Sequence, residues 1–366
     1  MFMSSRSLIT VLLLAAVPLG FLVSCAEMQS ARNMGVETGA PAVAGTEVSA
    51  PPSAAAVASP EDSQLATETA VQDLPAITDL AAVPAPRPDV MRMGPSGIHD
   101  SHDRETSVNV LCEQIGNKLT SVSNEDCMQQ SFTFGGGFSV NQRPLIFKEH
   151  MSSQPDFGDF RVLVMGGIHG DEYSSISILF KWLSLFSPQA LEGNIHWRFA
   201  PLVNPDGLLD DTQAKRQNAN GVDLNRNFPS RDWNDTAARY WQESTGSNPR
   251  RFPGSGPGSE PEVQWVVQQI EEFQPDVIVS VHAPYHLLDF DGPAVAPNKI
   301  GELYLHQLGI YPGSLGNFAG LNRQIPVVTL ELPSAGIMPP AEQIDLMWKD
   351  LVIWIDREGR KGLSRL

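Results

Sequence analysis

The stretch RVLVMGGIHGDE, residues 161–172, decides the fold. Its first five residues are almost entirely apolar, as in a buried strand, and the glycine pair at 166–167 ends that strand with a turn. Apolar residues then recur at helical spacing, which predicts a helix over 172–186. A buried strand that turns directly into a helix is the repeating unit of α/β proteins.

The same alternation continues along the rest of the chain. Short apolar runs predict three further strands, at 195–203, 276–281 and 326–332. Two further helices are predicted, at 259–273 and 340–357. The first of these opens with Ser259 and Glu262, which have the spacing of a capping box. We therefore expect an α/β fold, with a mixed, mostly parallel twisted sheet, helices on both faces and functional residues at strand ends.

Charge and composition exclude several classes of protein. The 366 residues carry 42 acidic and 25 basic side chains, which gives a net charge of −17. Nucleic acids and anionic membrane surfaces would repel such a protein, so no nucleic-acid partner is expected. A hydrophobic share of 42% is ordinary for a globular protein and excludes a polytopic membrane protein.

The N-terminus has the features of a lipoprotein signal peptide. Arg6 precedes a short uncharged apolar segment that ends in Leu22-Val23-Ser24-Cys25. This run resembles a bacterial lipobox, which implies cleavage before Cys25 and acylation of that residue. An ordinary secretory signal or an uncleaved anchor is the alternative. Because Glu27 rather than Asp stands two positions after the cysteine, the sorting rules of Gram-negative bacteria imply delivery to the outer membrane.

Residues 26–100 are predicted to be a disordered tether. Between residues 41 and 60 alone there are seven Ala and four Pro, and no aromatic residue. Such a segment cannot bury enough apolar surface to offset the entropy of ordering it. The expected organisation is therefore a signal peptide over 1–25, the tether, and a catalytic domain over 101–366.

Two cysteines remain once Cys25 is assigned to the lipid, namely Cys112 and Cys127. An exported protein lies in an oxidising compartment, which favours a disulfide between these two residues. Two free buried thiols are the alternative. A cysteine-based metal site is not expected, because the sequence has no Cys-x-x-Cys spacing.

Chemistry-bearing side chains gather at the predicted strand ends. His169 and Glu172 lie at the turn into the first helix, and His282 follows the third predicted strand. Two imidazoles and a carboxylate suit a catalytic Zn²⁺ site, which needs three protein ligands and one open position. The alternative is a pair of polar loop residues and a structurally satisfied histidine. His286 is not expected to be a ligand, because Pro284 separates it from His282.

Further motifs follow in a definite order, and their spacing adds to this pattern. They are Asn204-Pro205-Asp206-Gly207, Arg216 to Phe228, Gly258 to Glu262, and Thr329-Leu330-Glu331-Leu332. Together with the two histidines and Glu172, this set resembles the zinc carboxypeptidase family M14 over residues 131–357. The segments at 138–145 and 312–316 resemble those of its murein peptide amidase subgroup, whose members cut between γ-D-glutamate and meso-diaminopimelate in cell-wall peptides.

The resemblance implies catalytic roles for four residues. It makes His169, Glu172 and His282 the ligands of one Zn²⁺ per chain, which activates water and polarises the scissile carbonyl. Glu331 becomes the general base and acid, and burial on an apolar strand would raise its pKa into a useful range. A structural ion pair is the alternative for this glutamate.

Other matching residues are implied to bind or orient the substrate. Arg216 would stabilise the oxyanion, and Asn225 with Arg226 would hold the terminal carboxylate of the substrate. Asp223 would orient the first histidine ligand. Tyr311 corresponds either to the mobile tyrosine of digestive carboxypeptidases or to an ordinary loop residue. For the arginines and Asn225, the alternative is a solvated polar loop.

These features lead to one expected function and two alternatives. We expect a periplasmic, lipid-anchored zinc metallopeptidase that hydrolyses the γ-D-glutamyl–meso-diaminopimelate amide bond of peptidoglycan stem peptides. The first alternative is a general metallocarboxypeptidase for L-peptides, or a deacylase of N-acyl amino acids. The second is a non-catalytic wall-binding lipoprotein, which is expected to have lost a metal ligand or the glutamate. No protein partner is predicted.

Overall fold

The structure is a computed structural model that describes residues 101–151, 160–186, 195–359 and 361. The predicted signal peptide over 1–25, with Cys25, and the predicted tether over 26–100 lie outside the described residues. Within the described part of the chain, every helix is too short or too polar to cross a lipid bilayer.

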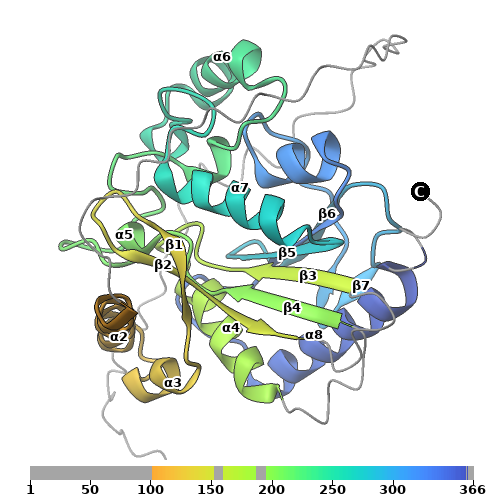
Figure 1. Ribbon diagram of the computed structural model, residues 1–366. Coiled ribbons are helices and arrows are strands. Elements are labelled where there is room, and N and C mark those ends of the chain that lie inside the picture. Colours follow the sequence, from red (N-terminus) through yellow and green to blue (C-terminus); the bar gives the residue numbers. More distant parts are fainter. Residues whose placement is uncertain (1–100, 152–159, 187–194, 360, 362–366) are drawn as a thin grey trace, which may run out of the picture. The chain divides into compact units, whose positions relative to one another are not determined.

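Seven strands form one mixed sheet, in the order β1-β2-β4-β3-β5-β9-β6 (Figure 1). Their bounds are β1 Thr133–Phe138, β2 Pro144–His150, β3 Phe160–Met165, β4 Ile195–Ala200, β5 Val277–His282, β6 Leu287–Asp291 and β9 Val327–Glu331. The four central strands β4, β3, β5 and β9 are parallel, and β1, β2 and β6 add antiparallel pairings at the edges. Two short strands, β7 (Lys299–Ile300) and β8 (Leu303–Tyr304), pair separately. The predicted mixed sheet is confirmed.

Helices and helical turns connect these strands. The helices are α2 Ser101–Lys118, α3 Asn124–Gln129, α4 Tyr173–Leu185, α5 Pro205–Leu208, α6 Trp233–Thr245, α7 Pro261–Phe273 and α8 Ala341–Trp354. The shorter helical segments are η2 Leu224–Arg226, η3 Pro249–Arg251, η4 Gly316–Asn322 and η5 Ile355–Gly359. The three helices predicted from the sequence correspond to α4, α7 and α8, with ends that differ by a few residues.

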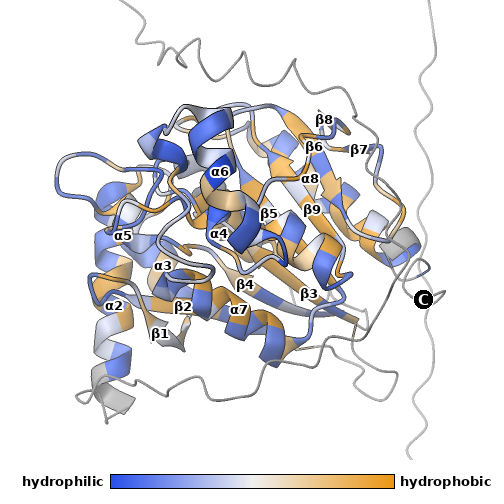
Figure 2. Cartoon of the chain, turned by 90° about the horizontal axis from the view of Figure 1, so that it is seen from above, coloured by the Kyte–Doolittle hydropathy of each residue, from blue (hydrophilic) through white to orange (hydrophobic). Residues whose placement is uncertain are grey.

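Side chains of the strands alternate between the two faces of the sheet, and each face has its own hydrophobic cluster. On β3, Val162 and Val164 join the cluster that includes α4 and α8, whereas Leu163 and Met165 join the cluster that includes α7 and η4. Figure 1 shows α7 on one side of the sheet and α4 and α8 on the other. Figure 2 shows hydrophobic residues concentrated in the central strands. Helices therefore cover both faces, as predicted.

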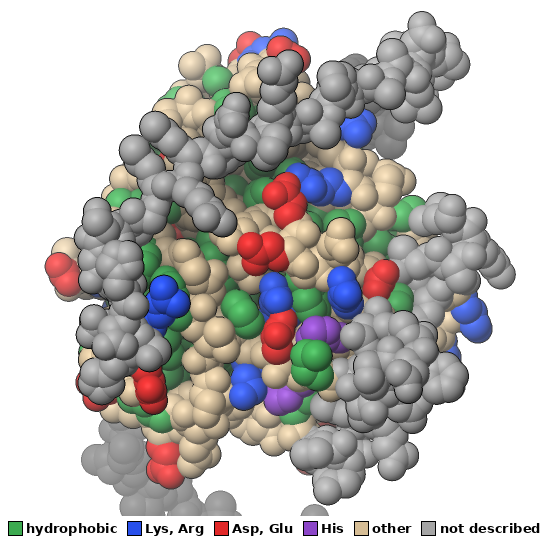
Figure 3. Space-filling model, in the orientation of Figure 1, with side chains coloured by type: hydrophobic (Ala, Val, Ile, Leu, Met, Phe, Trp, Pro, Cys, Tyr) green, Lys and Arg blue, Asp and Glu red, His purple; other side chains and the backbone are tan. Residues whose placement is uncertain are grey.

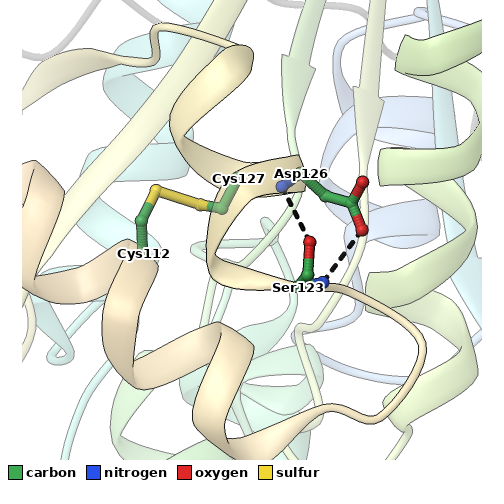
Figure 4. The surroundings of a disulfide bond; sticks show 4 residues. All are labelled: Cys112, Ser123, Asp126 and Cys127. Atoms are coloured by element: carbon green, nitrogen blue, oxygen red, sulfur yellow. Dashed lines mark hydrogen bonds between the residues drawn. A yellow bond between two sulfur atoms is a disulfide. The ribbon is translucent and has the colours of Figure 1, made fainter.

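A disulfide between Cys112 and Cys127 joins α2 to α3 (Figure 4). Both cysteines are buried, and their Cα atoms lie 5.4 Å apart. Ser123 caps α3, because its hydroxyl accepts a hydrogen bond from the backbone N–H of Asp126 at 3.0 Å. The Asp126 carboxylate accepts one from the backbone N–H of Ser123 at 2.9 Å in return. The predicted disulfide is confirmed.

Candidate metal centre

Three buried side chains converge at the ends of the neighbouring parallel strands β3 and β5. His169 and Glu172 lie in the turn between β3 and α4, and His282 is the last residue of β5. The turn is tight at Gly167, whose φ of +61° is a conformation that glycine adopts without strain. Ligating atoms of the three side chains all lie within 4.8 Å of one another. The structure thus brings together the three residues that the sequence predicted as metal ligands.

The two imidazole rings present the same nitrogen, Nδ1, to the centre of this group. Nε2 of His169 lies 3.1 Å from Oδ1 of Asp223, and Nε2 of His282 lies 3.1 Å from Oγ of Ser280. Because an ionised carboxylate can only accept, Nε2 of His169 carries a proton, and in the neutral ring Nδ1 is then the nitrogen that can bind a metal. Asp223 therefore has the position from which an outer carboxylate orients a metal-binding histidine.

The separations of these atoms fit a zinc site. The two Nδ1 atoms lie 3.3 Å apart, and Nδ1 of His282 lies 3.1 Å from Oε2 of Glu172. Tetrahedral ligands at about 2.0–2.1 Å from Zn²⁺ are about 3.3 Å from one another. Nδ1 of His169 lies closer to Oε1 of Glu172, at 2.7 Å. Atoms that face each other this closely in a buried space share a positive charge, which is a proton in the metal-free protein and would be the cation once a metal is bound.

The charges in this group depend on one another. Burial would by itself raise the pKa of Glu172, but His169 and His282 hold that pKa well below its usual range. Burial would lower the pKa of His282, and the charge and hydrogen bond of Glu172 raise it instead. Glu172 is also held by the backbone N–H of Ala283, which donates to Oε2 at 3.2 Å. The carboxylate is therefore ionised and fixed between the two rings.

Arg216 closes one side of the centre. Its Nε donates a hydrogen bond to Oδ2 of Asp223 at 2.9 Å, and its Nη1 lies 3.5 Å from Oε1 of Glu172. Although burial opposes the charged form, Asp223 and Glu172 raise the pKa of this arginine. Arg216 thus places a permanent positive charge beside the metal centre, which the predicted oxyanion role requires.

Glu331 lies next to the metal centre on β9. In the sheet register it is directly paired with His282 on the same face, so the two Cα atoms are about 4.8 Å apart. The backbone N–H of Tyr285 lies 3.5 Å from its Oε2. Burial raises the pKa of Glu331 to about 7. The charge of His282 opposes this shift, and the negative charge of Glu172 adds to it. Its pKa shift has the direction expected from the sequence, and no arginine or lysine forms an ion pair with this glutamate among the described residues.

Arg226 lies in η2, with its guanidinium 4.4 Å above the ring of Tyr311. The side chain is 8% exposed, and its Nε has no hydrogen-bond partner. Burial lowers the pKa of Arg226 to about 10, which leaves it charged at neutral pH. A buried guanidinium with an unused donor is suited to bind a carboxylate. The structure therefore places Tyr311 against Arg226, and the role of both residues in substrate binding stays a prediction.

Asn225 is partly exposed and lies beside Arg226. Its Oδ1 accepts a hydrogen bond from the backbone N–H of Leu315 at 2.9 Å. This contact ties η2 to the segment that leads into η4. The amide group therefore has a structural contact through its oxygen, and its nitrogen is the part suited to binding a substrate carboxylate.

The capping box predicted from Ser259 and Glu262 is wrong. Helix α7 begins at Pro261 after Glu260, and no side chain caps its first turn. Glu262 is fully buried instead, where Oε2 accepts a hydrogen bond from the Asn218 side chain at 3.0 Å and Oε1 accepts one from the backbone N–H of Val140 at 3.1 Å. The spacing was that of a cap, but the carboxylate is used in a long-range contact.

This network had not been identified from the sequence as part of the site. Glu260 also accepts a hydrogen bond from Asn218, at 2.7 Å, and Asn218 accepts one from the backbone N–H of Val222. The two glutamates therefore hold the turn that precedes Asp223, the residue that orients His169. The signal was present, because both glutamates and Asn218 lie within the quoted motifs, but the pattern does not show what they contact.

Comparisons with known proteins agree with this geometry. A sequence profile described as zinc carboxypeptidase matches residues 124–288. Murein peptide amidase A of Escherichia coli K12 is 30% identical over 231 residues, which cover 61% of this chain and 90% of that protein. Murein peptide amidase A of Vibrio campbellii is 32% identical over 182 residues, or 47% of this chain and 69% of that protein. The crystal structure of carboxypeptidase A from Helicoverpa armigera superposes with a TM-score of 0.51 at 17% identity, covering 69% of this chain and 79% of that one, and so shares the fold.

The buried Glu262 predicts a pH-dependent stability. Burial raises the pKa of Glu262 from 4.5 to about 7. Between pH 4.5 and 7 the folded state therefore keeps a proton on this carboxyl that the unfolded state has lost. The free energy of unfolding of the wild type, relative to Glu262→Gln, should therefore fall by up to about 3 kcal/mol as pH rises from 4.5 to 7. Urea unfolding at several pH values measures this difference, and a constant difference contradicts the assignment. Glu243→Gln, which replaces an exposed glutamate, controls for loss of a surface charge.

Metal binding predicts a second effect on stability. Zinc at 100 times its dissociation constant should raise the free energy of unfolding by about 2.7 kcal/mol, because it binds only the folded state. Thermal unfolding of metal-free protein, with and without zinc, measures the shift. His282→Ala should lose it and His286→Ala should keep it, since His286 is exposed and outside the group. A zinc-dependent shift that survives in His282→Ala would place the metal elsewhere.

Proposed function

This chain belongs to the zinc carboxypeptidase family M14, and we propose that it hydrolyses the γ-D-glutamyl–meso-diaminopimelate amide bond of peptidoglycan stem peptides. Membership of the family makes it a zinc-dependent hydrolytic enzyme. The observation that supports the substrate is the similarity to murein peptide amidases, which extends over 90% of the Escherichia coli protein. The buried group of His169, Glu172 and His282, with Glu331 beside it, supports an intact catalytic centre.

The metal ligands in this proposal are His169, Glu172 and His282. Zinc held there would lower the pKa of a bound water toward 7 and polarise the scissile carbonyl. The protein's part is to keep the two Nδ1 atoms unprotonated and aimed at one point. Asp223 does this for His169 through its contact at Nε2, and Ser280 has the matching position for His282.

Glu331 is the proposed proton carrier of the reaction. A general base must take a proton from water and later give it to the leaving amine, so its pKa should lie near the working pH. Burial on β9 raises the pKa of Glu331 to about 7, which meets this requirement before metal is added. Because no arginine or lysine among the described residues forms an ion pair with it, the carboxylate is free to change its protonation state.

The arginines have separate tasks in the proposal. Arg226 would bind the α-carboxylate of the diaminopimelate residue through its unused Nε, with the amide nitrogen of Asn225 beside it. Arg216 would face the oxygen on which negative charge develops, since Asp223 and Glu172 hold it at the centre. The substrate carboxylate and the reacting carbonyl are thus fixed by two different guanidinium groups.

We also propose that the enzyme acts outside the cytoplasm, anchored by lipid at Cys25 and carried on the tether over 26–100, in the periplasm and at the outer membrane. The Cys112–Cys127 disulfide supports export, because such bonds persist in oxidising compartments. The lipobox and the tether composition support the anchor and the reach toward the cell wall.

The substrate proposal predicts a clear preference. The enzyme should release diaminopimelate from L-Ala-γ-D-Glu-meso-diaminopimelate at least 100-fold faster than it releases Phe from an acylated L-dipeptide, because a site built for one polar residue rejects analogues that leave its groups unpaired. Comparing kcat/KM for the two substrates tests this. Faster cleavage of the dipeptide would instead identify a general carboxypeptidase.

The role of Glu331 predicts a separation between activity and metal binding. Glu331→Gln should lower kcat by at least about 100-fold, since general base catalysis contributes 10²–10⁴. Zinc content and thermal stability should be retained, because the amide has the same shape and no charge to bury. Enzyme kinetics together with metal analysis measure both. A Gln variant that keeps full activity would refute the assignment.

A further inference from the structure

Strand β6 brings two carboxylates onto the sheet face that carries Glu331. In the register of β6 and β9, Leu287 pairs with Glu331, Asp289 with Thr329, and Asp291 with Val327. Paired residues of neighbouring strands lie on the same face, so both aspartates share the face of Glu331 and the metal ligand His282. The surface in Figure 3 shows acidic and basic side chains interspersed. Asp289 and Asp291 differ from these surface charges because their side chains are recessed.

Packing on the opposite face agrees with this placement. Leu288 and Phe290, which alternate with the two aspartates, both belong to the cluster that includes α4 and α8. Asp289 is only 6% exposed and Asp291 is partly buried. Among the described residues, no lysine or arginine forms an ion pair with either carboxylate. Two carboxylates recessed side by side are costly to ionise together, and a cationic ligand would reduce that cost.

A chain of contacts joins this acidic pair to the buried cation Arg226. The backbone N–H of Leu308 donates a hydrogen bond to Oδ1 of Asp289 at 3.2 Å. The carbonyl of the same residue accepts one from the hydroxyl of Tyr311 at 2.8 Å. The ring of Tyr311 lies 4.4 Å beneath the guanidinium of Arg226. One segment, residues 308–311, therefore touches Arg226 at one end and Asp289 at the other.

Helical segment η4 forms a second wall beside the acidic pair. Both Gly316 and Gly320 pack directly on Asp291, and a Cβ atom at Gly316 would overlap the carboxylate. The segment that enters η4 is tied to the Arg226 side by the Leu315–Asn225 hydrogen bond. Glycine is thus required at position 316, because any side chain there would push the Asp291 carboxylate away from η4.

Arg226 supplies the positive charge at the other end of this chain of contacts. It is 8% exposed and its Nε has no hydrogen-bond partner, so the guanidinium keeps donor capacity for an anion. A positive group at one end and two carboxylates at the other match a ligand with a carboxylate and, some distance away, an ammonium group.

We propose that Asp289, backed by Asp291, accepts the side-chain ammonium group of a diamino acid whose α-carboxylate is held by Arg226. The assignment deepens the proposed function and rests on it, since it names the groups that select the residue on the leaving side of the scissile bond. Asp289 pairs with Thr329, which lies two residues before Glu331 on β9. The Cα atoms of Asp289 and Glu331 are therefore about 8 Å apart. The two nitrogens of an extended diaminopimelate or lysine are six bonds apart, about 7 Å.

The charge of the pair suits a single ammonium group. Burial raises the pKa of Asp291 to about 7, and the neighbouring Asp289 adds to the shift. Burial also raises the pKa of Asp289, against its hydrogen bond from Leu308. A hydrogen bond to a charged group contributes about 1.5–3 kcal/mol, or about 10- to 150-fold in affinity.

The experiment compares substrates that differ in this one amine. Stem peptides L-Ala-γ-D-Glu-X are prepared with X as meso-diaminopimelate, L-lysine or L-norleucine, and blocked dipeptides ending in lysine or norleucine form a second series. The wild type should cleave the lysine peptide at least 10-fold faster than the norleucine peptide in kcat/KM, mainly through KM. Asp289→Asn should bring this ratio close to one, and Asp291→Asn should reduce it. Asp235→Asn, an exposed aspartate on α6, should leave the ratio unchanged.

The outcomes separate this proposal from the proposed function. A wild type that cleaves norleucine as fast as lysine in both series overturns the ammonium site, whatever its activity on stem peptides. Equal losses on lysine and norleucine substrates in Asp289→Asn also overturn it, because they indicate a structural role. Cleavage of the dipeptides alone, with the lysine preference kept, overturns the murein substrate and supports the ammonium site. No cleavage in either series overturns both.

Discussion

Two histidine nitrogens and a carboxylate meet in a buried space, and the rest of the structure depends on this contact. The Nδ1 atoms of His169 and His282 are 3.3 Å apart, with Glu172 between the two rings. An ionised Glu172 buried between two imidazoles needs a positive charge at this point, which either a proton on a ring or a metal ion supplies. Metal binding therefore contributes to the stability of the fold as well as to its chemistry.

The parallel centre of the sheet is what makes this contact feasible. Strands β3 and β5 are neighbours and end on the same edge, so residues 113 positions apart in the sequence reach one point. The next strand, β9, adds Glu331 beside His282 in the same register. The antiparallel edge strand β6 extends this face with Asp289 and Asp291. One face of the sheet thus carries the ligand His282, the proton carrier and the acidic pair on three neighbouring strands, and the turn after β3 adds His169 and Glu172 at its edge.

Local patterns in the sequence predicted the central strands, the helices α4, α7 and α8 and the Cys112–Cys127 disulfide, because each depends on composition or spacing over a short range. Helices α2 and α6, which are as long or longer, were not predicted. The antiparallel edge strands β1, β2 and β6 were not among the predicted strands. Strands β1 and β2 form a local hairpin, whereas the pairings of β2 with β4 and of β6 with β9 join segments far apart in the sequence. The Glu262 error has the same origin: a Ser-x-x-Glu spacing describes a cap, while the partners of this glutamate, Asn218 and Val140, belong to other segments. Likewise, the position of Tyr311 beneath Arg226 depends on how η2 meets the segment before η4.

The central claim is that His169, Glu172 and His282 hold one zinc ion in the folded enzyme. The most direct test is a crystal structure of zinc-loaded protein with anomalous diffraction measured on both sides of the zinc absorption edge. The account predicts one strong anomalous peak per chain, about 2.0–2.2 Å from Nδ1 of both histidines and from a Glu172 oxygen. A protein with no peak at this position, or with its only peak at other side chains, would contradict it.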